Sequence, residues 1–356
     1  MRRYKKDITP RLSEGGFAWR TPVPRIFDRH LHSIIFIYNT KEGRSNGKGG
    51  GTGFIYGVAS EYDPKAFFPY LVTNKHVIEG ATGDRVFVQV NKKDGGSEAL
   101  DIDISHWTFH RDGDDLAIVP VRVLPRDIYE YDFIRDDLSI DNEFIEQYDI
   151  GAGDDVFMVG RFTAIDQFKK EHRRSYPVVR FGNIALGETL PVYNEKIKRY
   201  QDSYLVDMRS IPGFSGSPVI VYIQPFDVRP KDDMKSFFKK HWDERLLGIT
   251  WGYIHATEEG WDADDNRKKI KVRLSSSVAG VIPVSKLQEM VMYEEFIKMR
   301  KNFDEQLKEK DKETQVSAAS EDASEGNFTR KDMEDSLKKA FRPDGGQTSD
   351  EGKSKT

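Results

Sequence analysis

Three short motifs carry the residue types that acyl transfer by a serine hydroxyl requires. Ser215 lies in the sequence PGFSGSP, His76 follows the run YLVTNK, and Asp115 directly precedes the apolar run LAIV. A hydroxyl nucleophile needs a base that takes its proton and an acid group that orients this base. We therefore expect His76 to be the base and Asp115 the orienting acid for a nucleophilic Ser215.

The turn around Ser215 also predicts donors for the oxyanion of a tetrahedral intermediate. Gly213 allows a sharp turn, so that its backbone N–H and that of Ser215 would point to one oxyanion hole. Gly216 removes side-chain bulk where a substrate backbone would pass. We prefer Asp115 to Asp114 as the acid because Asp115 adjoins the predicted strand, which leaves Asp114 as a solvated loop residue.

Each motif alone is common, since a serine between glycines is often a simple turn and a histidine after a strand is more often structural. In the chain order histidine, aspartate, serine, however, the segments GTGF…LVTNKHV, DDLAIVPV and GFSGSPVIV resemble the trypsin-like (chymotrypsin-fold) serine peptidase family. They look most similar to its cysteine-free bacterial branch, which includes the HtrA-type proteases. The resemblance covers about residues 26–287.

This resemblance implies an all-β fold of two antiparallel six-stranded β-barrels, with the active site in the cleft between them. It implies a serine endopeptidase that works through an acyl-enzyme intermediate, with His76 and Asp115 on the first barrel and Ser215 on the second. The alternative is a catalytically silent trypsin-like scaffold or binding module that acts through its loops and tail. The presence of all three chemical groups favours the enzyme.

The resemblance also implies a substrate pocket near the nucleophile. The residues that would line it are Arg209, which precedes Ser215 by six residues, and the strand residues Thr250, Trp251 and Gly252. A cation at Arg209 would favour an acidic side chain at the P1 position of the substrate. The other interpretation is that Arg209 points to solvent or pairs with a loop acid.

Two departures from the family pattern concern regulation. Phe214 stands directly before Ser215, where zymogen-activated members carry an aspartate that pairs with a newly cut N-terminus. Activation by N-terminal cleavage is therefore not expected, and control would come from loops, tail or a partner. We also do not expect the PDZ domain typical of HtrA proteins, because the chain after Phe303 reads as too short and too polar to form one.

Short β-rich runs separated by Gly, Asp, Asn and Pro clusters predict the domain organisation. We expect an N-terminal arm at residues 1–25, a first barrel at 26–125, a linker at 126–149, a second barrel at 150–284, a C-terminal helix at 285–303 and a disordered charged tail at 304–356. Ser285 and Gln288 predict a capping box at the start of the helix. The charged segments 224–245 and 255–271 read as surface loops, and these loops or a short helix at 329–341 are candidate docking sites for a partner protein.

The composition excludes several kinds of site. The 356 residues contain no cysteine, which excludes disulfides and cysteine-ligated zinc, and a net charge of -4 offers no basic field for nucleic acid. His106 and His110 are four residues apart but lack further ligand spacing, so we expect no metal and no cofactor, and only a protein or peptide substrate. Neither a membrane-spanning run nor a signal-peptide pattern is present, which predicts a cytoplasmic protein without membrane contact.

Overall fold

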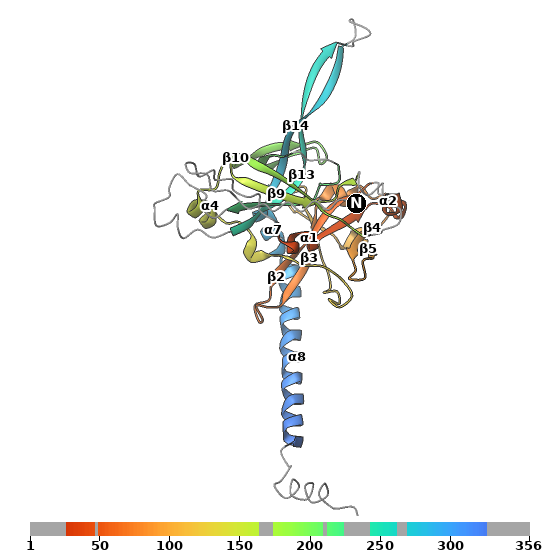
Figure 1. Ribbon diagram of the computed structural model, residues 1–356, viewed down its shortest axis with the longest axis vertical. Coiled ribbons are helices and arrows are strands. Elements are labelled where there is room, and N and C mark those ends of the chain that lie inside the picture. Colours follow the sequence, from red (N-terminus) through yellow and green to blue (C-terminus); the bar gives the residue numbers. More distant parts are fainter. Residues whose placement is uncertain are drawn as a thin grey trace, which may run out of the picture.

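The computed structural model of this protein contains two β-sheets followed by C-terminal helices (Figure 1). It describes residues 26–46, 49–163, 174–208, 212–223, 243–261 and 269–325. The predictions for the N-terminal arm, for Arg209, for most of the loop at 224–245 and for the short helix at 329–341 lie outside the described residues.

The first sheet contains eight strands. These are β1 (Ile34–Tyr38), β2 (Gly51–Ala59), β3 (Phe67–Thr73), β4 (Arg85–Asn91), β5 (Ser97–Asp103), β6 (Thr108–Phe109), β7 (Ala117–Pro120) and β8 (Ile134–Arg135). Seven of them follow the antiparallel order β5-β4-β1-β2-β3-β7-β6, and β8 pairs in parallel with β2. The first barrel was expected to have six strands, and in the part of the chain described here its two edges do not pair to close it.

The second sheet is a closed six-stranded barrel, as predicted. Its strands are β9 (Asp155–Gly160), β10 (Val178–Asn194), β11 (Arg199–Asp207), β12 (Pro218–Ile223), β13 (Asp243–Trp261) and β14 (Lys269–Pro283), in the order β10-β11-β14-β13-β12-β9. The all-β prediction of two antiparallel, curled sheets is therefore confirmed.

The central strands of the first sheet are apolar on both faces, and one of these faces packs against the second barrel. Successive side chains of a strand point to opposite faces, and β1 carries five buried apolar residues in a row. Ile35 and Ile37 belong to a core cluster inside the first sheet, whereas Phe36 belongs to a larger cluster that includes Val156 and Phe157 of the second barrel. One face of the first sheet thus forms a common core with the second barrel, and residues at this junction can meet across it.

Two segments differ from their predicted form. The proposed loop at 255–271 is largely strand, because β13 and β14 stay paired as far as Trp261 and Lys269 and form a hairpin that projects from the barrel (Figure 1). The proposed linker at 126–149 contains β8, η2 (Asp136–Leu138) and α4 (Asn142–Tyr148). Ile140 and Phe144 of this segment are buried in the common core, which gives it a fixed place.

Short helices precede or connect the strands of the first sheet. They are α1 (Asp28–His32), α2 (Lys41–Asn46), α3 (Lys75–Glu79) and the 3-10 turn η1 (Ile104–His106). The predicted C-terminal helix is divided into α7 (Val284–Val291) and α8 (Glu294–Glu325). The residue that caps α7 is Pro283, and no side chain caps it, so the expected capping box at Ser285 is wrong.

Helix α8 extends into the segment that was expected to be a disordered tail. It continues from residue 304 to Glu325 without a glycine or proline and is rich in Glu, Lys, Gln and Ala, which are strong helix formers. The helix is also anchored within its first half, because the Asp304 carboxylate accepts hydrogen bonds from the Ser60 hydroxyl (2.5 Å) and the Glu61 N–H (3.3 Å). Intrinsic propensity and this anchor together explain the helix where polarity alone predicted disorder.

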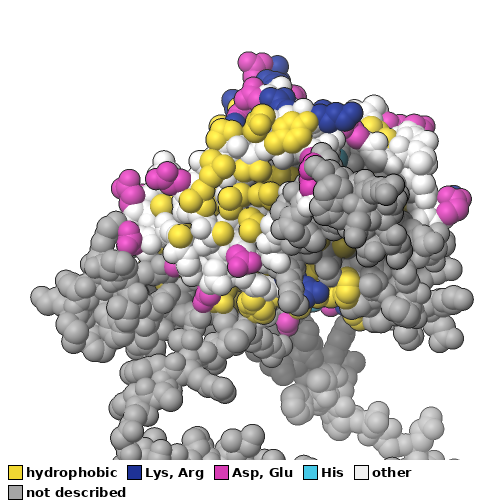
Figure 2. Space-filling model, turned by 90° about the horizontal axis from the view of Figure 1, so that it is seen from above, with side chains coloured by type: hydrophobic (Ala, Val, Ile, Leu, Met, Phe, Trp, Pro, Cys, Tyr) yellow, Lys and Arg dark blue, Asp and Glu magenta, His cyan; other side chains and the backbone are white. Residues whose placement is uncertain are grey.

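Hydrophobic side chains are gathered on the face of the molecule that is seen from above (Figure 2). Four of the exposed large hydrophobic residues, Phe181, Leu186, Tyr193 and Tyr200, lie on β10 and β11. Among the described residues, no helix is both long enough and apolar enough to cross a lipid bilayer.

Candidate active site

His76 is held by the short helix that follows β3. It lies in the first turn of α3, and its imidazole Nδ1 is 2.6 Å from Oδ2 of Asp115. The backbone N–H of His76 donates to Oδ1 of the same carboxylate at 2.9 Å. This two-point contact fixes the ring, and the carboxylate on Nδ1 leaves Nε2 as the nitrogen that faces the rest of the site. The His76 side chain is 15% exposed, so the imidazole lies at the surface of a buried network.

Asp115 is fully buried and is bound by groups from both sheets. Its Oδ2 accepts a hydrogen bond from Asn194 Nδ2 at 3.0 Å, and its N–H donates to Gln201 Oε1 at 2.9 Å. Its carbonyl accepts from Asn74 Nδ2 at 2.8 Å. Asn194 and Gln201 belong to β10 and β11 of the second barrel, so the geometry of this carboxylate depends on how the two sheets pack.

Ser215 lies in the tight loop between β11 and β12. Gly213 has φ +107° and Gly216 has φ +87°, a region that favours glycine. A Cβ at Gly216 would lie 2.1 Å from the carbonyl oxygen of Thr52, so this position also lacks space for a side chain. The loop is fixed to β2, because the Thr52 N–H donates to the Ser215 carbonyl at 2.8 Å and the Thr52 hydroxyl donates to the Gly213 carbonyl at 2.6 Å.

The predicted oxyanion amides lie on this same loop. Among the described residues, neither the Gly213 N–H nor the Ser215 N–H donates to a backbone carbonyl, whereas the neighbouring Gly216 N–H donates to Thr250 and the Ser217 N–H donates to Phe214. The expectation that the Gly213 and Ser215 amides bind an oxyanion therefore stays a prediction.

A lysine that the sequence interpretation did not include contacts both His76 and Ser215. Lys196 lies in the turn between β10 and β11, and its Nζ is 2.8 Å from His76 Nε2 and 3.1 Å from Ser215 Oγ. Within the described chain, no direct hydrogen bond joins His76 to Ser215, and the Ser215 hydroxyl lies 3.4 Å from the Trp251 carbonyl. Loss of hydration around the ammonium lowers the pKa of Lys196, and the nearby Asp115 only partly offsets this effect.

The turn that carries Lys196 is itself tied to the acid. The Lys196 N–H donates to Asn194 Oδ1 at 3.0 Å, while the amide nitrogen of the same Asn194 side chain binds Asp115. Lys198, at the end of the turn, adopts φ +55°. One asparagine thus links the orientation of the carboxylate to the position of the lysine.

A cavity of about 290 Å³ adjoins this turn. It lies between the end of β10 and the middle of β13, and Lys196, Trp251, Gly252, Tyr253 and His255 are among the residues that line it. Two of the predicted pocket residues, Trp251 and Gly252, therefore face a cavity beside the proposed nucleophile. Thr250 is fully buried and donates its N–H to Ser217, so it supports the loop and does not line this cavity.

The expectation for Asp114 is wrong. Asp114 is buried, its Oδ2 lies 3.2 Å from His110 Nδ1, and Lys286 Nζ lies 3.6 Å from the same oxygen. The Leu116 N–H donates to the Asp114 carbonyl, so the chain turns at Asp115, and the two neighbouring carboxylates bind different histidines. The choice of Asp115 as the partner of His76 agrees with this geometry.

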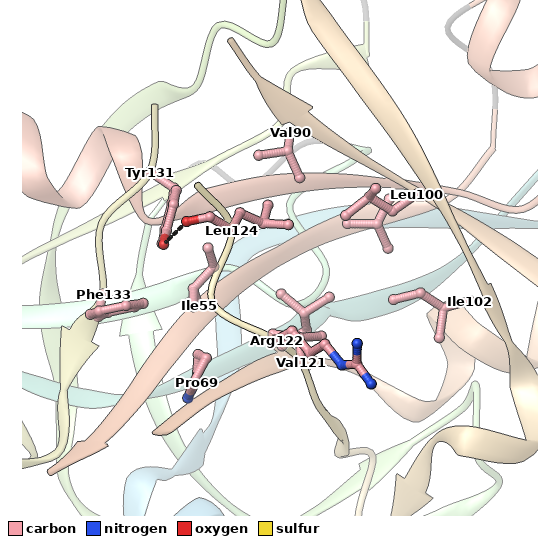
Figure 3. Close-up of a pocket in the computed structure, with 12 residues that line it drawn as sticks. Ile55, Pro69, Val90, Leu100, Ile102, Val121, Arg122, Leu124, Tyr131 and Phe133 are labelled. Carbon is pink, nitrogen blue, oxygen red and sulfur yellow. Dashed lines mark hydrogen bonds between the residues drawn. The ribbon is translucent and has the colours of Figure 1, made fainter. Parts of the chain in front are cut away.

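A second cavity, of about 220 Å³, lies inside the first sheet (Figure 3). Strand residues such as Ile55, Leu71, Val88 and Leu100 line it, and Arg122 is the only charged residue among its described lining residues. None of the lining residues belongs to the group around His76. Its apolar wall carries no group for acyl transfer, so it is not a second reaction site of this kind.

Comparison with known proteins gives one family match and several similar solved structures. Residues 51–222 match the family of the trypsin-like peptidase domain. No curated protein sequence matches the chain. Among solved structures, the chain is similar to an inactive form of the Rv3671c protease, with 15% sequence identity and a TM-score of 0.37 over 74% of this chain and 88% of that chain. A serine-to-alanine mutant of Rv3671c from M. tuberculosis H37Rv, also in an inactive form, matches with 16% identity and a TM-score of 0.35 over 74% of this chain and 86% of that one.

The matched segment begins with β2 and ends within β12, and it includes His76, Asp115 and Ser215. Residues 51–222 of the chain are therefore similar to the trypsin-like peptidase domain.

Proposed function

We propose that this protein is a serine endopeptidase in which Ser215, His76 and Asp115 act together. The observation that carries the proposal is the pair of His76 and Asp115, in which Nδ1 and Oδ2 are 2.6 Å apart. The other ring nitrogen of His76, Nε2, contacts Lys196 Nζ at 2.8 Å, and Lys196 Nζ also contacts Ser215 Oγ at 3.1 Å. This closeness of groups that are far apart in the sequence supports the proposal.

In the proposed reaction, Lys196 has first withdrawn from His76 Nε2. His76 Nε2 takes the hydroxyl proton as Ser215 attacks the scissile carbonyl carbon, and the carbonyl oxygen becomes an oxyanion beside the amides of Gly213 and Ser215. Collapse breaks the peptide C–N bond, and His76 gives its proton to the leaving amine. Water then repeats the sequence on the acyl-enzyme. Asp115 keeps the proton of the neutral ring on Nδ1 and stabilises the imidazolium.

The arrangement described here corresponds to a resting state. The Lys196 ammonium donates to the same Nε2 that must accept the serine proton, and its positive charge opposes formation of the imidazolium. Attack by Ser215 therefore requires the β10–β11 turn to withdraw. Control by this turn is consistent with Phe214 before the serine, because no acidic residue stands there to pair with a newly cut N-terminus.

The cavity next to the lysine is the proposed place for part of the substrate. Trp251 and Gly252 of β13 line it, and Gly252, with φ +148°, adds no side chain there. The acidic P1 preference proposed for Arg209 stays a prediction, and hydrolysis of peptides with P1 Glu, Leu or Lys tests it. Faster hydrolysis of the P1 Lys peptide would contradict the proposed acidic preference.

A fluorophosphonate probe tests the serine mechanism directly. The wild-type protein should be labelled on Ser215, and the Ser215→Ala variant should lose labelling and hydrolyse peptides roughly a million-fold more slowly. Ser217→Ala is the matched control, because this buried serine lies two residues away on the same loop and should leave labelling intact. Absence of labelling in the wild type under conditions that displace Lys196 would favour the scaffold alternative.

A further inference from the structure

A cluster of ionisable side chains lies away from the proposed reaction centre, between the β6–β7 loop and α7. It contains His110, Asp112 and Glu289, whose nearest nitrogen and oxygen atoms all lie within 4.8 Å of one another. His110 and Asp112 belong to the loop that leads into Asp115, and Glu289 belongs to α7. Neither the proposed mechanism nor the core packing requires these three groups to face one another.

His110 has the geometry of a ligand more than that of a hydrogen-bonded core histidine. Its side chain is completely buried, and among the described residues neither ring nitrogen makes a hydrogen bond of acceptable geometry. Its Nε2 nevertheless lies 3.4 Å from Oε2 of Glu289. A hydrogen bond would bring the oxygen onto the N–H axis, whereas two ligands of one ion lie beside each other and share the ion between them.

The distance fits a tetrahedral cation. Nitrogen and oxygen ligands bind zinc at about 2.0–2.2 Å, which separates two ligand atoms by about 3.3–3.6 Å in a tetrahedron. Asp112 and the Glu289 side chain, which is 46% exposed, lie at the surface and can adjust to complete the site. Two carboxylates and one neutral imidazole balance the charge of a divalent ion, and the exposed side leaves a fourth position for water.

The other ring nitrogen of His110, Nδ1, lies beside a carboxylate, as the second nitrogen of a zinc-binding histidine often does. Asp114 Oδ2 lies 3.2 Å from Nδ1, and Lys286 Nζ lies 3.6 Å from that oxygen. A carboxylate that accepts a hydrogen bond from the far nitrogen fixes the tautomer and makes Nε2 a better ligand. Asp114 is close enough to do this once the His110 ring turns slightly on binding the ion. The mixture of imidazole and carboxylate selects a transition-metal ion over magnesium or calcium, which prefer oxygen ligands alone.

We propose that His110, Asp112 and Glu289 bind one zinc-type divalent cation, with Asp114 as the carboxylate that orients His110. The ion would join the β6–β7 loop to α7, and so would hold in place the segment that leads into Asp115. Its role is structural, and it stands independently of the serine mechanism.

Zinc titration of the full chain, after treatment with a chelator, tests the site. Calorimetry should show one site per chain, and the thermal midpoint should rise with zinc concentration, since an ion that binds only the folded state stabilises it. Cobalt(II) in place of zinc should give the visible absorption of a four-coordinate ion. Glu289→Gln and Asp112→Asn change exposed residues, so both variants should fold, and each should weaken zinc binding by about tenfold or more.

Glu305→Gln is the matched control, because this exposed acidic residue lies on α8 outside the cluster and should bind zinc as the wild type does. The inference is overturned if the wild type binds no zinc, or if the Glu289→Gln and Asp112→Asn variants keep wild-type affinity, which would place the ion elsewhere. Peptide hydrolysis is not needed for any of these readouts, so failure here leaves the serine mechanism untouched.

Discussion

Lys196 brings a positive charge to the two atoms between which a proton must move. Its Nζ lies 2.8 Å from His76 Nε2 and 3.1 Å from Ser215 Oγ. Two unit charges 4 Å apart repel by about 1 kcal/mol in bulk water and about 4 kcal/mol near a protein surface. Because about 1.4 kcal/mol corresponds to a tenfold change in rate, we expect Lys196→Met to raise kcat/KM for peptide hydrolysis by about tenfold or more.

The matched control is Lys198→Met, which removes the same charge from the same exposed turn and should leave hydrolysis near the wild-type rate. Loss of activity in Lys196→Met would contradict the resting-state interpretation. In that case Lys196, with its lowered pKa and its contact to the serine hydroxyl, would act as the base for Ser215.

The pH dependence gives a second test of the same residue. Lys196 is exposed as a whole residue, but loss of hydration around its ammonium lowers its pKa below the ordinary lysine value, so its charge is lost at a lower pH than usual as the pH rises. Below that pKa the ammonium opposes the imidazolium, and above it the amine does not. Wild-type kcat/KM should therefore increase through an alkaline inflection and approach that of Lys196→Met, whose own profile lacks the inflection. Identical profiles for the two proteins would exclude a titrating lysine in the site.

At the scale of elements, one β2 residue fixes the loop that carries the nucleophile. The Thr52 hydroxyl donates to the Gly213 carbonyl at 2.6 Å and accepts from the Arg161 N–H at 2.9 Å. Thr52→Val keeps the shape but leaves these two groups without a partner, at a cost of about 1–3 kcal/mol in unfolding free energy. We expect a lower thermal midpoint together with a lower kcat, because the Gly213 amide loses its fixed position.

Thr52→Ser is the conservative control, since it retains the hydroxyl and should restore kcat. If Thr52→Val lowered stability but left kcat unchanged, the hydroxyl would be a structural group only, and the position of the oxyanion amides would not depend on β2.

Helix α8 is joined to the first sheet by aromatic packing. Phe296 is 2% exposed and lies edge-on to Tyr70, with ring centroids 5.4 Å apart. Phe296→Ala should lower the unfolding free energy by about 3–5 kcal/mol, measured by denaturant titration. Met299→Ala is the control on the same helix, because Met299 is 43% exposed and should change stability by no more than about 0.5 kcal/mol. Equal effects of the two substitutions would show that α8 does not pack as described.

The sequence predicts the elements near the proposed site better than those at the periphery. The three motifs lie on short, strongly apolar strands, so β3, β7 and β12 could be assigned from local pattern alone. The extension of β13 and β14 was missed because its many charged residues read as a loop, although Ile270, Val272 and Leu274 alternate with basic residues as in a strand. Asn194, Lys196 and Gln201 were missed because ordinary polar residues on a hairpin carry no motif, and their role arises only when the second barrel packs against Asp115.

At the scale of the whole molecule, the proposed site exists only at the contact between the two sheets. The first sheet supplies the base and the acid, and the second barrel supplies the nucleophile, the lysine and two of the groups that bind Asp115. The barrel closes through pairs near the base of β13 and β14, such as Ile249 with Ile282 and Gly252 with Gly280. The projecting part of the hairpin lies beyond these pairs and is remote from α8 (Figure 1).

This separation predicts that the hairpin tip is dispensable for the fold. Replacing residues 256–274 by an Asn-Gly turn keeps the His255 and Ser275 pair and supplies a two-residue connection suited to antiparallel strands. We expect a thermal midpoint within about 4 °C of the wild type and hydrolysis of short peptides within about twofold. A deeper replacement, from Gly252 to Gly280, removes barrel pairs and should abolish both folding and hydrolysis. If the shorter replacement also unfolded the protein, the tip would be part of what closes the barrel, and the packing that brings Ser215 to His76 would depend on it.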